Sequence, residues 1–366
     1  MEINQNIPKI SMVKGAPHKM KQWWKNIRRE HRDEVRTHLG ELTTLMNIRT
    51  DKVLTRLLIE FWDPTKVVFK FADFELVPTL EEVTSFTELP FNVRKPVLPV
   101  TMAGYRFFDA LGLTNSRSLR SIEDGWVSLD QMFDRFGHRE SYEWYSGEFQ
   151  FDQVTWKSLR PNTFAMELLG LLVFPQRRGR ININLLPVVL KTFHGNLQAT
   201  LVPMVLAEML RALSAYARGY DNFKGYNLLL QIWATEHFFQ WEATIDHFVG
   251  VSGRAILRTS QRYFIELIGL EGIQPYSPLQ VLRQFGMIQD VPLWTRTTLY
   301  EDDYNGQIPI PRIRKLQEEW NDLVTMHMGQ NSWCTPEYYV WINEEEELAR
   351  PSREGIAWLE DAVVSL

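Results

Sequence analysis

The chain has 366 residues, of which 45% are hydrophobic and 13% aromatic, and its formal net charge at pH 7 is −5. This composition excludes intrinsic disorder, and the negative charge excludes a global field that draws the protein to nucleic acid or membranes. The single cysteine, Cys334, excludes an intramolecular disulfide and a cysteine-based zinc site. The longest apolar run, residues 168–174, is far shorter than a bilayer span, so we expect a nuclear or cytoplasmic protein with no membrane partner.

A basic segment opens the chain. Residues 14–39 are rich in Lys and Arg, carry Trp23 and Trp24 at partly helical spacing, and are followed by Gly40 as a candidate C-terminal cap. The pattern predicts one basic amphipathic helix. Its candidate contacts for nucleic acid or an acidic partner are Lys21, Lys25, Arg28 and Arg29. The alternative is a solvated face whose long cationic side chains lie over an apolar stripe anchored by tryptophan.

The next elements are short. Residues 51–61 predict a helix that faces the core, and residues 67–71 and 74–76 predict the two strands of a small β-hairpin. Thr79 and Glu82 have the spacing of a capping box, so a helix should begin there. Helices are also expected at 102–111 and 129–136, and residues 112–125 are the best candidate for a flexible insertion.

The second half is dominated by helical patterns. Helices are expected at residues 161–174, 185–193, 199–216, 227–248, 253–268, 278–286, 312–328 and from 336 and 352 onward. The predicted fold class is therefore mainly α: an irregular multi-helix globular domain with one or two small β-hairpins. We expect residues 1–40 to form a basic N-terminal helical segment and residues 41–366 one helical domain, with a candidate division near residues 112–160.

No catalytic or cofactor motif is present. The sequence contains no phosphate-binding loop, no nucleophile elbow and no HExxH helix, and the cluster around Gly250 and Gly253 lacks the lysine of a phosphate loop. Glu236 and His237 form a candidate polar groove, but His237 and His247 would lie on different faces of one helix. The prediction is no catalytic residue, no metal site and no cofactor.

The sharpest local feature is a basic turn at residues 177–180. Arg177, Arg178 and Arg180 surround Gly179, and guanidinium groups suit the forked geometry of phosphate and carboxylate groups. These three arginines are candidate contacts for nucleic acid or an acidic partner. A solvated turn between two apolar helices is the alternative that the sequence leaves open.

Four blocks resemble the plant mobile domain, a family also described as aminotransferase-like and related to transposon-associated plant proteins. They are Phe61-Trp62-Asp63-Pro64 with residues 69–71 and 74–82, then 174–182, 201–208 and 227–237. The blocks extend over residues 20 to 270, and the later segment through Trp341 is in keeping with them. Residues 41–366 would then be a helical domain similar to this family. Aminotransferase activity is not expected, because no lysine has the context of a pyridoxal-phosphate site.

The resemblance implies a non-enzymatic interaction module of transposon or retrotransposon origin that acts through protein partners. Contact with nucleic acid or with chromatin-associated partners is the accompanying hypothesis. Two alternatives stay open: an enzyme with a scattered carboxylate and histidine site, and an oligomeric structural scaffold. The sequence leaves the identity of the partner and the oligomeric state undetermined.

Overall fold

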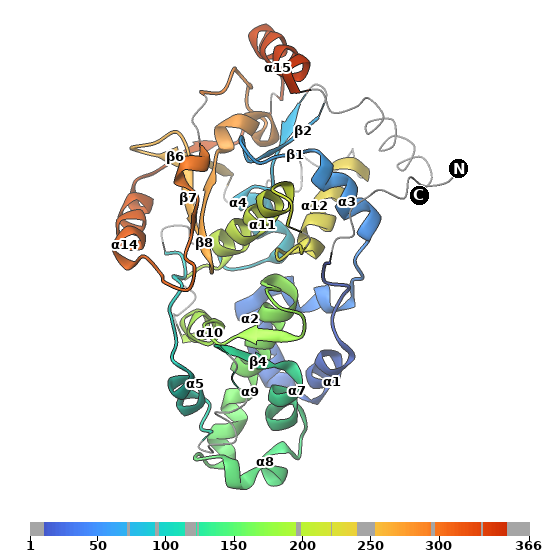
Figure 1. Cartoon of the computed structure of the whole chain (residues 1–366), viewed down its shortest axis with the longest axis vertical. Helices are drawn as coiled ribbons and strands as arrows, with labels where there is room; N and C mark the ends of the chain where they lie inside the picture. Colours follow the sequence, from blue (N-terminus) through green and yellow to red (C-terminus); the bar gives the residue numbers. More distant parts are fainter. Residues whose placement is uncertain are drawn as a thin grey trace, which may run out of the picture.

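The computed structural model describes residues 11–71, 74–91, 95–113, 122, 124–194, 199–220, 222–239, 253–293, 297–330 and 332–349. Of these residues, 54% are helical and 15% lie in strands. Four small antiparallel sheets are distributed among the helices (Figure 1). The prediction of a mainly α fold with one or two hairpins was therefore wrong, and the protein is a mixed α/β structure.

The helices occupy both ends of the molecule in Figure 1. They are α1 His18–Asn26, α2 Arg29–Leu39, α3 Lys52–Glu60, α4 Leu80–Thr87, α5 Gly104–Ala110, α7 Leu129–Met132, α8 Ser141–Trp144, α9 Gln153–Leu168, α10 Leu185–His194, α11 Val202–Ala217, α12 Asn227–Phe239, α14 Ile310–Glu319 and α15 Pro336–Ala349. Tighter or wider helical turns are η1 Gly40–Asn47, η2 Phe133–Gly137, η3 Ser146–Glu148, η4 Leu169–Val173, η5 Pro278–Phe285, η6 Thr297–Tyr300 and η7 Trp320–Asp322. In the described part of the chain, no helix combines the length and the apolar character of a membrane span.

The strands form short antiparallel pairings. They are β1 Trp62–Asp63, β2 Val68–Lys70, β3 Glu75–Leu76, β4 Trp126–Ser128, β5 Arg180–Asn182, β6 Arg254–Thr259, β7 Ile265–Ile268, β8 Gly272–Tyr276, β9 Asp302–Asp303 and β10 Leu323–His327. The sheets have the orders β1-β2-β3, β10-β6, β4-β5 and β7-β8-β9. The hairpin expected at residues 67–76 is confirmed as β2 and β3, and β1 adds a third strand to it.

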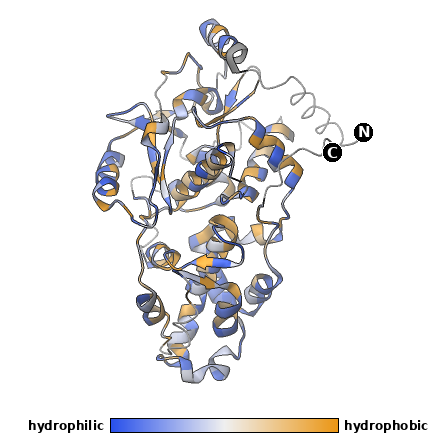
Figure 2. Ribbon diagram, in the orientation of Figure 1, coloured by the Kyte–Doolittle hydropathy of each residue, from blue (hydrophilic) through white to orange (hydrophobic). Residues whose placement is uncertain are grey.

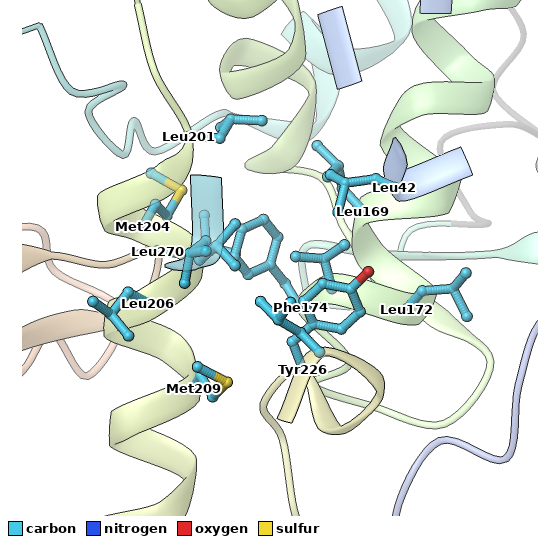
Figure 3. Packing of buried hydrophobic residues seen from close by; sticks show 14 of the residues in the cluster. Leu42, Leu169, Leu172, Phe174, Leu201, Met204, Leu206, Met209, Tyr226 and Leu270 are labelled. Carbon is cyan, nitrogen blue, oxygen red and sulfur yellow. The ribbon is translucent and has the colours of Figure 1, made fainter. Parts of the chain in front are cut away.

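One hydrophobic core runs through both ends of the molecule. Its centre is α11, whose side chains Met204 and Met209 lie opposite Phe174 and Tyr226 (Figure 3). Peripheral helices such as α14 carry both hydrophilic and hydrophobic residues, as expected where one face meets solvent (Figure 2). The amphipathic periphery and the apolar centre together explain why most helices were found from periodicity.

In the second half, one predicted helix is wrong and another is too long. Residues 253–268 form β6 and β7, and residues 312–328 form α14 followed by η7 and β10. Every residue of β7 and β8 is buried, so these strands lack the alternation of polar and apolar residues by which strands are recognised. Strand β6 pairs with β10 about seventy positions later, a partner that a local pattern does not reveal.

The basic N-terminal segment is two helices and not one. Ile27, in extended conformation, ends α1, and Arg28 precedes α2 with the same conformation. Ile27 is buried and so are Trp23 and Val35, because the break turns an apolar side chain of each helix toward α9 and η2. Burial of these side chains outweighs the few helical hydrogen bonds lost at the break.

Gly40 ends α2, as expected for a C-terminal cap, with φ 50°. A Cβ at this position would collide with the carbonyl oxygens of Thr87 and Glu88 in the turn after α4. We expect Gly40→Ala to lower the free energy of unfolding by about 2 kcal/mol, because it adds this collision to the strain of a positive φ. Chemical denaturation measures the loss. Gly125→Ala is the control, since its φ is also positive and no atom lies within 4 Å of its Cβ; an equal loss there would contradict the collision.

Some predictions fall on residues outside the described ranges. They are most of the flexible insertion expected at 112–125, the end of the helix expected at 227–248, the first three residues of the glycine cluster at 250–254 and the last helix from residue 352.

Candidate functional site

The basic turn at residues 177–180 leads into strand β5. Arg180 donates its backbone N–H to the carbonyl of Arg177, 3.2 Å away, and Gly179 has φ 68°, which glycine adopts without strain. Arg178 is exposed at the tip of the turn. The guanidinium of Arg177 lies 4.7 Å from the ring centre of Trp126 in β4, the strand paired with β5. The turn is therefore held rigidly at the end of a small sheet.

A cavity of about 840 Å³ opens beside this turn. Its walls come from the N-terminal segment 11–17, the start of α3, η4, the turn at 175–179 and the segment 222–224 between α11 and α12. Five cations line it: Lys14, Lys52, Arg177, Arg178 and Lys224. No Asp or Glu is among its lining residues. We call this space the basic cavity.

Hydrogen bonds hold the N-terminal wall of the basic cavity. Phe223 donates its backbone N–H to the carbonyl of Ser11 at 2.9 Å, and Asn227 donates Nδ2 to the carbonyl of Val13 at 3.0 Å. The hydroxyl of Thr50 also donates to Val13. Because these bonds use backbone carbonyls, the segment stays in place while its side chain Lys14 remains exposed to the solvent.

The cations of the basic cavity form no close ion pair with the described residues, although Lys224 interacts electrostatically with Glu271. Within the described part of the chain, none of the five has a carboxylate oxygen at ion-pair distance, although the structure contains many ion pairs elsewhere. Like charges that converge on one space repel one another, and a bound anion offsets this repulsion. The cavity is therefore electrostatically suited to phosphate or carboxylate groups.

A second cavity, of about 640 Å³, adjoins the first. Its walls are the C-terminal half of α11, the following turn, β8 and β9 with the residues before each strand, and η6. Its charged lining residues are Arg211, Arg218, Lys224, Glu271, Glu301, Asp302 and Asp303. Tyr220 also lines it, with 64% of its surface exposed. Because both signs of charge are present, we call it the mixed cavity.

The acidic groups of the mixed cavity differ in their environments. Glu208 accepts hydrogen bonds from Arg211 Nη2 at 2.8 Å and from the backbone N–H of Glu271 at 2.8 Å. Burial raises the pKa of Glu271 to about 7, Glu208 adds to this rise, and Arg211 opposes it. Asn182 of β5 donates Nδ2 to Glu271 Oε1 at 2.8 Å. At neutral pH, Glu271 can therefore accept a hydrogen bond as a carboxylate or donate one as an acid.

The two cavities meet at three residues, Gln176, Asn222 and Lys224, which line both. Strand β5 begins at the basic turn and ends at Asn182, which donates a hydrogen bond to Glu271 of the mixed cavity. The Nε2 atom of Gln176 is buried and has no hydrogen-bond partner among the described residues. An unsatisfied buried donor costs free energy, so this amide gains stability from any acceptor that a small rotation of the side chain brings within reach.

The candidate residues predicted from the sequence fall in three places. Arg177 and Arg178 line the basic cavity, whereas Arg180 is half-buried in β5 and does not line it. The cations of the N-terminal helices also lie outside the lining of both cavities: Lys21, Lys25, Arg28 and Arg29. Lys21 is half-buried, and the other three are exposed on α1, between the helices and on α2.

The candidate polar groove at Glu236 and His237 belongs to a buried network. His237 Nε2 lies 2.8 Å from Glu82 Oε1, so among the described residues its partner is Glu82 of α4 and not the adjacent Glu236. Glu82 also accepts hydrogen bonds from Trp233 Nε1 at 2.9 Å and Gln284 Nε2 at 3.0 Å. Glu236 is half-buried on α12. This network connects α4, α12 and η5, which is a structural role.

Several residues of the two cavities were not singled out from the sequence: Lys52, Tyr220, Glu271, Asp302 and Asp303. The acidic run Glu301–Asp303 was a visible pattern, but acidic runs are common on solvated surfaces. Lys14 was noted as one cation of a helix, whereas it lies in the segment before α1. No spacing in the sequence relates these positions, because the fold brings them together from distant segments.

Within the described residues, no three His, Cys, Asp or Glu side chains converge as they would around a metal ion. The buried thiol of Cys334 lies 4.0 Å from Arg283 Nη1, away from both cavities.

Comparison with known families gives one match: a domain of unknown function (DUF7745), over residues 20–250. No curated protein and no solved structure matches the chain. The matched range contains Lys52, the basic turn, Tyr220 and Lys224, whereas Lys14 and Glu271 lie on either side of it.

Proposed function

Because the chain belongs to the family described as a domain of unknown function (DUF7745), a description that states no activity, we propose its function from the basic cavity. The protein is an interaction module that binds nucleic acid through phosphate groups held in this cavity. One observation carries the proposal: five cations and no carboxylate line a single concave space. Lysine and arginine contacts to phosphate supply most of the affinity of such binding.

A local site agrees with the overall charge of the protein. A net charge of −5 does not attract a polyanion over the whole surface, so binding has to depend on one patch. The proposal keeps the transposon or retrotransposon origin and the non-enzymatic role that the resemblance to the plant mobile domain implies. Chromatin-associated protein partners would then reach nucleic acid through this module.

The test compares two triple variants that remove the same charge. The cavity variant carries Lys14→Ala, Lys52→Ala and Arg178→Ala, and the control carries Lys25→Ala, Arg28→Ala and Arg29→Ala. We expect the cavity variant to bind a labelled oligonucleotide at least tenfold more weakly at low salt, because three phosphate contacts are lost. The slope of log K against log salt should fall by about 2, since each contact to a single strand contributes roughly 0.7. Fluorescence anisotropy across a salt series measures both quantities.

The outcomes separate the possible surfaces. If the control variant loses the affinity and the cavity variant does not, the contact surface is the N-terminal helices and the basic cavity is excluded. If the wild-type chain binds polyglutamate as tightly as the oligonucleotide, the partner is an acidic protein. Thermal unfolding of both variants must match the wild type, since all six side chains are exposed or half-buried.

The same samples test the two alternatives. If the protein cleaves the oligonucleotide during incubation, shorter products on a gel would favour the enzyme with a scattered carboxylate and histidine site. This alternative is considered because burial raises the pKa of Glu271 in the mixed cavity to about 7. A molar mass from light scattering that increases with protein concentration would favour the oligomeric scaffold.

A further inference from the structure

The mixed cavity contains the groups that recognise a nucleoside. Tyr220 presents an exposed aromatic ring at this cavity, directly after Gly219, whose φ of 96° turns the chain out of α11. Exposed tyrosines stack on unpaired bases, because every base has a π-face. A cavity of about 640 Å³ lies beside this ring.

The other walls of the mixed cavity supply hydrogen-bonding groups. Gln274 and Asp303 line it together with Glu271, whose Oε1 is held by Asn182. Carboxylate oxygens accept hydrogen bonds from the amino groups of bases and from ribose hydroxyls. Asp303 Oδ1 lies 3.4 Å from Arg211 Nη1, and this position keeps the carboxylate at the wall of the cavity.

The basic cavity and the mixed cavity are adjacent, because Gln176, Asn222 and Lys224 line both of them. Lys224 can contact a phosphate from either side, and the buried Nε2 of Gln176 is an unused donor at the same junction. A ligand that places a phosphate in the basic cavity would extend its sugar and base past this junction toward Tyr220.

We propose that the two cavities form one bipartite site for a nucleotide unit with an unpaired base, its phosphate in the basic cavity and its nucleoside in the mixed cavity. This inference rests on the proposed function and makes it more specific: the ligand is single-stranded nucleic acid. A base within a duplex is stacked and paired, so it cannot reach the ring of Tyr220 without being extruded.

The test uses the full chain with short labelled oligonucleotides of one sequence, single-stranded and as a duplex. We expect the single strand to bind at least tenfold more tightly than the duplex. Tyr220→Ala should weaken single-strand binding about tenfold and leave duplex binding unchanged, because loss of stacking affects only the unpaired base. Tyr220→Phe should bind as the wild type does. Tyr105→Ala is the control, since Tyr105 is exposed on α5 and lines neither cavity.

A competition experiment identifies the source of the nucleotide. Adenosine monophosphate should displace the single strand from wild-type protein but not from Tyr220→Ala, whereas inorganic phosphate should be a weaker competitor for both. If unlabelled adenosine monophosphate displaces the labelled strand at the same concentration as unlabelled strand does, the ligand of this site is a free nucleotide. If inorganic phosphate and adenosine monophosphate displace the strand equally well, the mixed cavity does not bind the nucleoside and this part of the proposal is wrong.

The failures of the two proposals are distinguishable. If Lys14, Lys52 and Arg178 are needed but single strand and duplex bind equally and Tyr220→Ala has no effect, the basic cavity binds nucleic acid and the bipartite site is wrong. If neither nucleic acid nor mononucleotide binds the wild-type chain, both proposals are overturned. Glu271→Gln should weaken adenosine binding while inorganic phosphate binding stays unchanged, a result that a merely structural role of Glu271 would not give.

Discussion

Glu82→Ala is expected to lower the free energy of unfolding by about 4 kcal/mol, because one buried carboxylate serves several hydrogen-bond partners. Glu82 closes the capping box of α4 by accepting the backbone N–H of Thr79 at 2.8 Å. It also accepts hydrogen bonds from Trp233 and Gln284, and its Oε1 lies 2.8 Å from His237 Nε2. Removal of the carboxylate leaves these buried partners without an acceptor, and each unsatisfied group costs about 1–3 kcal/mol.

Chemical denaturation followed by tryptophan fluorescence measures this loss, since Trp233 is buried beside the network and stacks on Phe69. Glu337→Ala is the matched control, because Glu337 is exposed in the first turn of α15 and should change stability by less than about 0.5 kcal/mol. A loss at Glu82 no greater than in this control would show that the network does not stabilise the fold.

Glu167→Gln is expected to remove a loss of stability that the wild type undergoes as pH rises from 5 to 7. Glu167 lies in α9, fully buried, and neither carboxyl oxygen has a hydrogen-bond partner among the described residues. Burial raises its pKa well above the usual 4.5. Well below pH 4.5 both states bind the proton, so the contribution to stability is complete. As pH rises, the unfolded chain releases the proton before the folded chain does, so stability falls by at most about 1.4 kcal/mol per pH unit.

The glutamine variant has no proton to release, so its stability relative to the wild type should rise between pH 5 and pH 7. A fixed cost of the buried amide is the same at both pH values and cancels from the comparison. Burial also raises the pKa values of Glu75 and Glu81 to about 7, but both proteins share these groups. Glu318→Gln, at an exposed position of α14, should give no difference between pH 5 and pH 7. A constant offset for Glu167→Gln would show that its carboxyl group titrates normally.

The elements found correctly from the sequence are those specified by near neighbours. The capping box at Thr79 and Glu82 was found because its two hydrogen bonds join residues three positions apart. Pro161 was read as the first residue of a helix, whereas α9 begins at Gln153, with Asp152 as its cap and Pro161 inside it. The polar first turns of α9 concealed the cap. Strand β6 was missed because its partner β10 is far along the chain, whereas the hairpin of β7 and β8 was missed because both strands are buried throughout.

The candidate site was predictable to a similar extent. The turn at Arg177 and Arg178 is a local pattern, and the structure places both side chains at the basic cavity. Lys14, Lys52 and Lys224 are ordinary lysines in the sequence, and only the fold brings them to the same space. The mixed cavity was not predicted from the sequence, because Tyr220, Glu271 and Asp303 do not form a sequence motif.

The N-terminal wall of the basic cavity has a consequence for ligand preference. The match to the family begins at residue 20, after this wall, and ends at residue 250, before Glu271 and Asp303. The matched range therefore carries the cations of the turn, and the segments on either side supply Lys14 to the basic cavity and Glu271 and Asp303 to the mixed cavity. If the site binds as proposed, substitution of an exposed lining residue in these segments, such as Lys14 or Asp303, changes ligand preference and leaves intact the core that β7 and β8 share with α11.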